Sequence, residues 1–135
     1  MRCSIRDGRW RRTTAAIGLA AALLLGSARI ARAGILASGY LWSDDAEAMV
    51  CLLLNVSATP VTITAAKIVD AAGTTIATFN GCDQVTLQPG GRCAVRAKTK
   101  QAAGIVKLDG PRGRVRGNCQ LNTVDDTILA SIEMR

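Results

Sequence analysis

Apolar and polar residues alternate along several short runs of the chain. The runs "TPVTITAAKIVD" (residues 59–70) and "RCAVRAK" (residues 92–98) place apolar residues at alternate positions, with threonine or basic residues between them. Successive side chains of a β-strand point to opposite faces, so a period of two is typical of a strand with one buried and one exposed face. These two runs therefore predict half-exposed antiparallel strands.

One run is apolar at both sets of alternate positions. In "AMVCLLLNVS" (residues 48–57), Met49, Cys51 and Leu53 fall on one face, while valine and leucine residues fall on the other. A strand with two apolar faces is covered on at least part of both sides. We therefore expect this run to form a central strand of a sheet.

The remaining strand-like runs are "TIATF", "GIVKLDG", "GRVRGNCQL" and "DTILASIEM", and breaks rich in glycine, proline and aspartate separate them. Helical periodicity is convincing only within residues 1–33. Short strands with turn signals about every ten residues are typical of two packed sheets. The sequence therefore predicts an all-β, antiparallel β-sandwich of seven to eight strands.

Residues 1–33 have the composition of an export signal. A basic start, "MRCSIRDGRWRR", precedes the apolar run "AAIGLAAALLL" of eleven residues, and "GSARIARA" then supplies small residues at positions 31 and 33. As a helix, this run spans only about half of a ~30 Å hydrocarbon core, which favours a cleaved signal peptide over a membrane anchor. We expect cleavage after Ala33. The general secretory route is favoured over the twin-arginine route that Arg11 and Arg12 suggest.

Much of the positive charge lies in this leader. Residues 1–33 hold seven of the 17 lysine and arginine residues and one of the ten acidic residues, so residues 34–135 hold ten bases and nine acids. This domain is close to neutral and has few aromatic residues to stack on bases, so no nucleic-acid binding is expected. We expect residues 34–135 to form one secreted or periplasmic domain, which meets a membrane only through the signal peptide during export.

Four of the five cysteines lie beyond the leader, an even number in a chain sent to an oxidising compartment. Separations of 30, 10 and 25 intervening residues do not fit a zinc site, the chain contains no histidine, and no C-x-x-C redox motif occurs. In "CDQVTLQPGGRC", a turn at residues 89–91 is expected to fold one short strand back on another and to bring Cys82 to Cys93. The remaining pair is Cys51 with Cys119.

Two segments together are similar to a known family. "CLLLNVSATPVTI" followed by "CDQVTLQPGGRCAVRA" resembles bacterial immunoglobulin-like modules of the ASH and choice-of-anchor type, where a strand ending in asparagine precedes a C…L-x-P-G-x-x-C hairpin. The likeness covers residues 51–97, and the chain then lacks the aromatic-x-Pro segment usual in those modules. The resemblance implies an immunoglobulin-like β-sandwich that binds or spaces other molecules. It implies no catalytic residues.

Other candidate sites have a simpler structural interpretation. Asn55 begins an "NVS" glycosylation motif, but its position at a strand end favours a structural role. The chain offers no histidine and no S-x-x-K motif, so we expect a non-enzymatic protein without cofactor or metal. Two acidic groups match no calcium loop and are expected in solvated loops: Asp44, Asp45 and Glu47, and Asp125 and Asp126.

The second half of the domain is basic. Residues 34–91 hold one base against five acids, whereas residues 92–135 hold nine bases against four acids. Period-two spacing predicts that two triplets of bases each share one strand face: Arg92, Arg96 and Lys98, and Arg112, Arg114 and Arg116. These six residues are the candidate anion-binding residues. The interpretation favoured over anion binding is that these charges form a solvated surface that protects a sheet edge.

The sequence therefore predicts a disulfide-stapled structural or interaction module whose partner is an unknown protein or envelope polymer. The alternative function is binding of an anionic surface polymer or lipid head group through the basic sheet face.

Overall fold

A computed structural model of the chain describes residues 33–135, so the predicted signal peptide lies outside the described residues except for Ala33. Within the described part, no helix is long and apolar enough to cross a membrane. The fold consists of ten strands and one short 3-10 helix: β1 (Gly34–Ala37), β2 (Leu41–Trp42), β3 (Ala48–Asn55), β4 (Val61–Val69), β5 (Phe79–Asn80), β6 (Val85–Leu87), β7 (Arg92–Lys98), β8 (Gln101–Asp109), η1 (Arg112–Arg114), β9 (Val115–Asn122) and β10 (Ile128–Met134).

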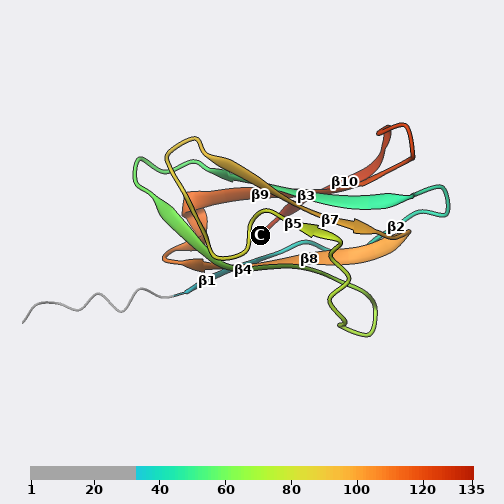
Figure 1. The fold of residues 1–135 in the computed structure, drawn as a ribbon, viewed down its shortest axis with the longest axis horizontal. Coiled ribbons are helices and arrows are strands. Elements are labelled where there is room, and N and C mark those ends of the chain that lie inside the picture. Colours follow the sequence, from blue (N-terminus) through green and yellow to red (C-terminus); the bar gives the residue numbers. More distant parts are fainter. Residues whose placement is uncertain (1–32) are drawn as a thin grey trace, which may run out of the picture.

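The strands form two antiparallel sheets that pack face to face (Figure 1). Sheet I has the order β1–β8–β4–β6, and β2 also pairs with β8. Sheet II has the order β10–β9–β3–β7–β5. The two layers confirm the predicted all-β class and the sandwich.

The strand count exceeds the seven to eight predicted, because several short strands depend on distant neighbours. β1 and β2 lie in a segment without strand periodicity, and both are held by pairing with β8. The prediction of a strand at "TIATF" (residues 75–79) is wrong over most of that segment. The segment forms one isolated bridge, Thr75 to Val69, and supplies the first residue of β5. Tertiary pairing, which local sequence does not encode, decides these short elements.

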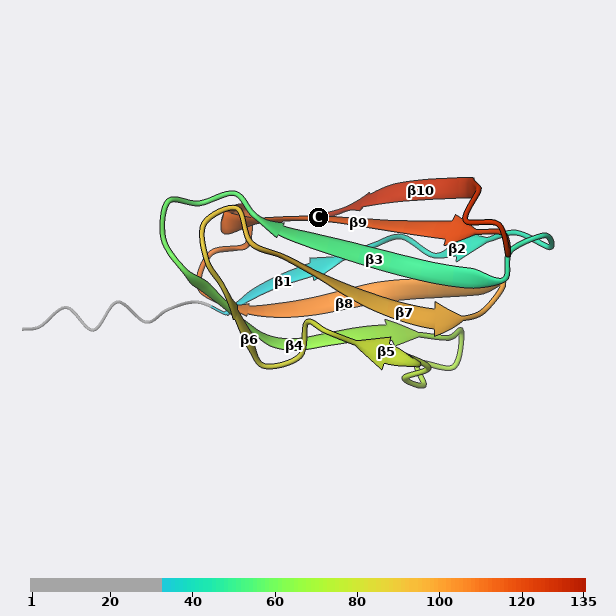
Figure 2. The ribbon, with the colours of Figure 1, turned by 45° about the horizontal axis from the view of Figure 1, so that its top comes forward.

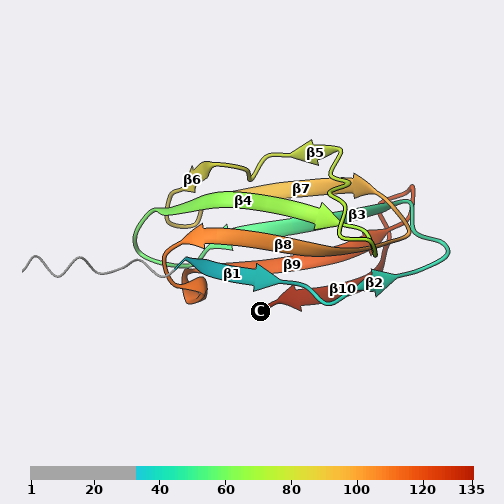
Figure 3. The ribbon, with the colours of Figure 1, turned by 90° about the horizontal axis from the view of Figure 1, so that it is seen from below.

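Two of the connections that cross between the sheets join strands that are also neighbours within each sheet. β3 in sheet II leads into β4 in sheet I, and β7 in sheet II leads into β8 in sheet I. Within the sheets, β3 pairs with β7 and β4 pairs with β8. These two crossings are therefore interlocked, and the strands β3, β4, β7 and β8 are distributed over both layers (Figures 2 and 3).

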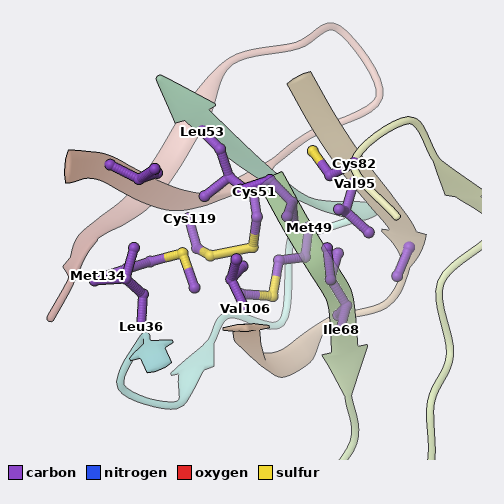
Figure 4. Packing of buried hydrophobic residues seen from close by; sticks show 14 of the residues in the cluster. Leu36, Met49, Cys51, Leu53, Ile68, Cys82, Val95, Val106, Cys119 and Met134 are labelled. Carbon is purple, nitrogen blue, oxygen red and sulfur yellow. A yellow bond between two sulfur atoms is a disulfide. The ribbon is translucent and has the colours of Figure 1, made fainter. Parts of the chain in front are cut away.

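The core fills the space between the sheets with apolar side chains from both. On β3 the inward residues Met49, Cys51 and Leu53 are almost completely buried. They meet inward residues of sheet I such as Ile68 and Val106 (Figure 4). At roughly 25 cal/mol per Å² of buried apolar surface, this continuous core is the main source of the domain's stability.

The structure contains both disulfides with the partners expected from the sequence. Cys51 and Cys119 are directly opposite each other on the neighbouring strands β3 and β9, with their Cα atoms 4.0 Å apart. This disulfide therefore lies within sheet II and points into the core (Figure 4). It closes a separation of 68 residues along the chain.

The second disulfide, Cys82 to Cys93, forms for a different reason than the sequence suggested. The turn at residues 88–91 does not fold a hairpin, because β6 pairs with β4 in sheet I whereas β7 pairs with β3 in sheet II. Cys82 instead follows β5, which pairs with β7, and the Gly81 amide donates to the Ala94 carbonyl (2.9 Å). The strand that brings Cys82 beside Cys93 is thus β5, which pairs with β7. The turn at residues 88–91 carries the chain from β6 in sheet I to β7 in sheet II.

Asn55 has the structural role expected for it. Its side chain is fully buried at the end of β3, where Nδ2 donates to the carbonyls of Thr59 and Leu87, both at 2.9 Å. Oδ1 accepts hydrogen bonds from the Ser57 amide and hydroxyl. Asn55 therefore closes the turn after β3 and ties it to β6, and all its polar atoms are satisfied within the fold.

Candidate functional site

The outer surface of sheet II combines an apolar central strand with basic neighbours. The alternation of β3 directs Ala48, Val50, Leu52 and Leu54 to this surface, because the residues between them face the core. β7 lies on one side of β3, and β9 lies on the other. We call this outer surface of sheet II the basic face.

The β7 residues of the basic face lie as the sequence predicted. Arg92, Arg96 and Lys98 occupy alternate positions of β7 and are all exposed. Phe79 of the edge strand β5 is directly opposite Arg96 and is also exposed. These three cations form one column beside β3.

The second predicted triplet is divided between two elements. Arg116 lies on β9, whereas Arg112 and Arg114 lie in η1 before the strand begins. The prediction of one shared strand face is therefore wrong for Arg112 and Arg114. Pro111 fixes the backbone for a turn, and the Arg114 amide donates to the Pro111 carbonyl (3.1 Å), so extended pairing starts only at Val115.

Arg112 and Arg114 consequently lie at one end of the sandwich. Arg112 lines a hollow with Leu36 of β1 and Arg135, near the end of the described chain. The Arg114 carbonyl accepts a hydrogen bond from the Val56 amide (2.9 Å). The six predicted candidates thus become four cations on the basic face, Arg92, Arg96, Lys98 and Arg116, and two at its end.

One ion pair occurs among the described residues. Nη1 of Arg116 lies 2.9 Å from Oε1 of Glu133 on β10, and both side chains are largely exposed, at 71% and 50%. An exposed pair of this kind contributes about 0–1 kcal/mol. Within residues 33–135, the cations of the β7 column have no carboxylate within ion-pair distance. The basic face therefore carries an excess of positive charge.

The apolar column of β3 is covered unevenly. Val50 lies between the long side chains of Arg96 and Gln120 in the register, and it is buried. Leu52 lies between Ala94 and Asn118, and 46% of it is exposed. The short Ala94 side chain does not cover its neighbour, so the central strand has an uncovered position in the middle of the sheet.

This uncovered position is part of a groove of about 510 Å³. Leu52 and Leu54 line it, together with Asn118 and Glu133. Arg92, Leu54 and Arg116 are directly opposite one another across β7, β3 and β9. Neighbouring strands lie about 4.8 Å apart, so the two arginine Cα atoms are on the order of 10 Å apart, one on each side of Leu54. Both arginines also line the groove.

The acidic residues singled out in the sequence lie elsewhere. Asp44 and Asp45 lie in the turn between β2 and β3, and Asp125 and Asp126 lie in the turn between β9 and β10. In the part of the chain that the structure describes, no three acidic or cysteine side chains gather in a group suited to a metal ion.

The exposed leucine is the feature that sequence reasoning missed. The run "AMVCLLLNVS" predicted a strand covered on both faces, and β3 is indeed central in its sheet. The run does not reveal that Ala94, 42 positions after Leu52, is the register partner that leaves it uncovered. The alternation of "RCAVRAK" contained the signal, since it places one alanine on the outer face among basic residues.

Comparison of the chain with protein-family models, with characterised proteins and with solved structures finds no match.

Proposed function

We propose that the protein is a non-enzymatic, secreted or periplasmic binding module and that the basic face is its binding surface. The observation that carries this proposal is Leu52, a large apolar side chain left 46% exposed in the centre of a sheet and lining a groove. Leu52 is not isolated, because it lines the groove together with Leu54, and a concave apolar site with a few polar groups at its rim is the usual form of a binding site.

The non-enzymatic role is supported by the side chains on offer. The chain contains no histidine. All four cysteines of residues 33–135 are in disulfides and cannot act as nucleophiles. The groove is lined by leucines, arginines, one glycine, one asparagine and one glutamate, which is a set suited to recognition.

The two disulfides are typical of a protein that folds in an oxidising compartment. Together with the export signal expected in residues 1–33, they support a location outside the cytoplasm. The proposal places the basic face where it meets extracellular or periplasmic molecules.

We further assign the domain to the immunoglobulin-like sandwiches on the basis of its central strands. In that fold, strands B and E are neighbours in one sheet and strands C and F in the other. β3, β7, β4 and β8 have the same order along the chain and the same pairing. The outer strands differ: β9 occupies the place beside β3, and β1 occupies the place beside β8. The fold of this domain would then be a variant with rearranged edges.

An anionic ligand is the chemistry that the basic face favours. The face carries four cations and, on the adjoining strand β10, the carboxylate of Glu133. Exposed like charges on one sheet repel one another, and an anionic polymer or lipid head group relieves that repulsion. Such binding weakens as salt rises, because charges are screened beyond about 8 Å at physiological ionic strength.

Retention of the purified protein on a heparin column tests the proposal. The double variant Arg92→Glu with Arg96→Glu should elute at markedly lower salt than the wild type. The control, Lys67→Glu with Lys107→Glu, makes the same change of charge on exposed residues of the outer surface of sheet I. If both double variants shift elution equally, retention follows net charge and the basic face is not the binding surface.

A further inference from the structure

We propose that the groove on the basic face binds a single-chain anionic amphiphile, of the fatty-acid or lysophospholipid type. The apolar chain lies over Leu52 and Leu54, and the anionic head lies at Arg92. This inference rests on the proposed binding surface and adds the chemical class of the ligand. It follows from three features of the groove: its floor, its backbone and the charge at its end.

The floor of the groove is made of apolar side chains on the central strand. Leu52 and Leu54 are two positions apart on the same face of β3, about 7 Å along the strand. Leu54 is partly buried and Leu52 is half exposed, so both retain apolar surface that a ligand can cover. A volume of about 510 Å³ lies in the range of small-molecule sites.

The backbone under the groove offers a ligand no hydrogen bonds. β3 is paired along its whole length with β9 and over residues 48–54 with β7. An extended peptide that adds to a sheet needs a free strand edge, and β3 has none. The groove therefore suits a ligand with few polar groups along its length, which favours a hydrocarbon chain over a peptide.

The charge at the end of the groove selects the head group. Arg116 is engaged by Glu133, at 2.9 Å. Among the described residues, Arg92 has no carboxylate within 4.0 Å, and it faces Leu54 directly across the strand pair. A guanidinium group binds a carboxylate or phosphate through paired hydrogen bonds. Arg92 therefore lies beside the apolar floor, so one ligand can place its anionic head at Arg92 and its hydrocarbon chain over Leu52 and Leu54.

Isothermal titration calorimetry with octanoate, decanoate and dodecanoate, below their micelle concentrations, measures both parts of the site. Each buried methylene strengthens binding up to about fourfold, so affinity should rise steeply along the series until the groove is filled. Dodecanol, with the same chain and no charge, should bind at least tenfold more weakly than dodecanoate. Equal affinity of the three acids, or equal affinity of dodecanol and dodecanoate, would overturn the proposal.

Three variants assign the ligand to the groove, and each has a matched control on sheet I. Leu52→Thr removes apolar floor and should weaken dodecanoate at least tenfold, whereas Ile35→Thr should have no effect. Ile35 is 52% exposed on the outer surface of β1. Arg92→Gln should abolish the preference for dodecanoate over dodecanol, whereas Lys107→Gln should preserve it. Lys107 is the register partner of Ile35.

The third variant fills the groove without removing any of its residues. Ala94→Gln places beside Leu52 a side chain like the Gln120 that covers Val50, so it should block dodecanoate binding. The control is Ala103→Gln on β8. Changes in the methyl NMR signals of Leu52 and Leu54 on titration of the wild type give a readout that no variant's folding can affect. Shifts confined to other leucines would refute the assignment.

Heparin retention separates this inference from the proposed function. If Leu52→Thr keeps wild-type retention on heparin and no fatty acid binds, the basic face is a binding surface for anions and the amphiphile proposal is wrong. If retention is insensitive to Arg92→Glu with Arg96→Glu and no fatty acid binds, both proposals are wrong.

Discussion

Gly104 lies directly against the sulfur of Cys119. A Cβ atom at Gly104 would lie 2.5 Å from Sγ of Cys119 and 2.7 Å from Sγ of Cys51, closer than real Cβ contacts allow. Gly104 is on β8 in sheet I, whereas the disulfide joins two strands of sheet II. Because glycine has no side chain, Gly104 leaves space between the sheets for the Cys51–Cys119 disulfide.

Gly104→Ala should destabilise the domain by about 1–3 kcal/mol, because the added methyl group overpacks the core. The control Gly113→Ala should have little effect, since nothing lies within 4 Å of a Cβ at that position. The loss should shrink when Cys51 and Cys119 are both alanine. Urea unfolding of the wild type, the two glycine variants, the double cysteine variant and Gly104→Ala in that double-variant background measures these differences. An equal loss with and without the disulfide would contradict the packing argument.

The two disulfides should differ in stability and in accessibility. In the chain-entropy model, loss of Cys51–Cys119 costs about 4 kcal/mol and loss of Cys82–Cys93 costs about 3 kcal/mol. Cys93 is the one partly exposed cysteine among the four, so mild reductant on the folded protein should open its disulfide first. Differential alkylation followed by mass spectrometry measures the order. Recovery of a peptide that links Cys51 to Cys82 would overturn the pairing.

Asn55→Ala should cost about 2–3 kcal/mol, because it leaves the buried carbonyl of Leu87 and the amide of Ser57 without partners. Ser57→Ala is the matched smaller change, since Oδ1 of Asn55 keeps its hydrogen bond from the Ser57 amide. We expect about 1 kcal/mol or less for it. Urea unfolding midpoints compare the two variants. Equal losses of stability would mean that the hydrogen bonds of Asn55 to Thr59 and Leu87 contribute little to the stability of the fold.

Glu133→Gln should leave the free energy of unfolding within about 0.5–1 kcal/mol of the wild type, because the ion pair with Arg116 is exposed. The same change removes the acid that pairs with a cation of the basic face. It should therefore raise the salt concentration at which the protein leaves a heparin column. Lower retention would show that Glu133 helps to position Arg116 for the ligand.

The fold class was predictable from the sequence because alternation is a local property. "RCAVRAK" shows its inward and outward faces within seven residues, and β7 follows that pattern. The register between strands is not local. The sequence paired Cys82 with Cys93 through a hairpin, whereas the structure brings them together through β5, a strand of two residues that carries no periodic signal.

The binding site was predictable only in part, for the same reason. The β7 cations follow from period two, but β8 ends before Gly110, which has φ 114°, and the short helix η1 (Arg112–Arg114) precedes β9, which begins only at Val115. Arg112 and Arg114 are thereby removed from the strand. The groove itself depends on Ala94 lying beside Leu52, and only the register of β3 with β7 specifies that neighbour.

The position of β3 in sheet II also has a consequence for folding. Both neighbours of β3 in sheet II, β7 and β9, come later in the sequence, and β9 ends only at Asn122. Until they dock, an eight-residue apolar strand is available with both edges unpaired. Folds dominated by such distant pairings form slowly, on the order of milliseconds to seconds. During that interval "AMVCLLLN" is the segment of this domain most exposed to aggregation, and a chaperone that shields it should raise the yield of folded protein.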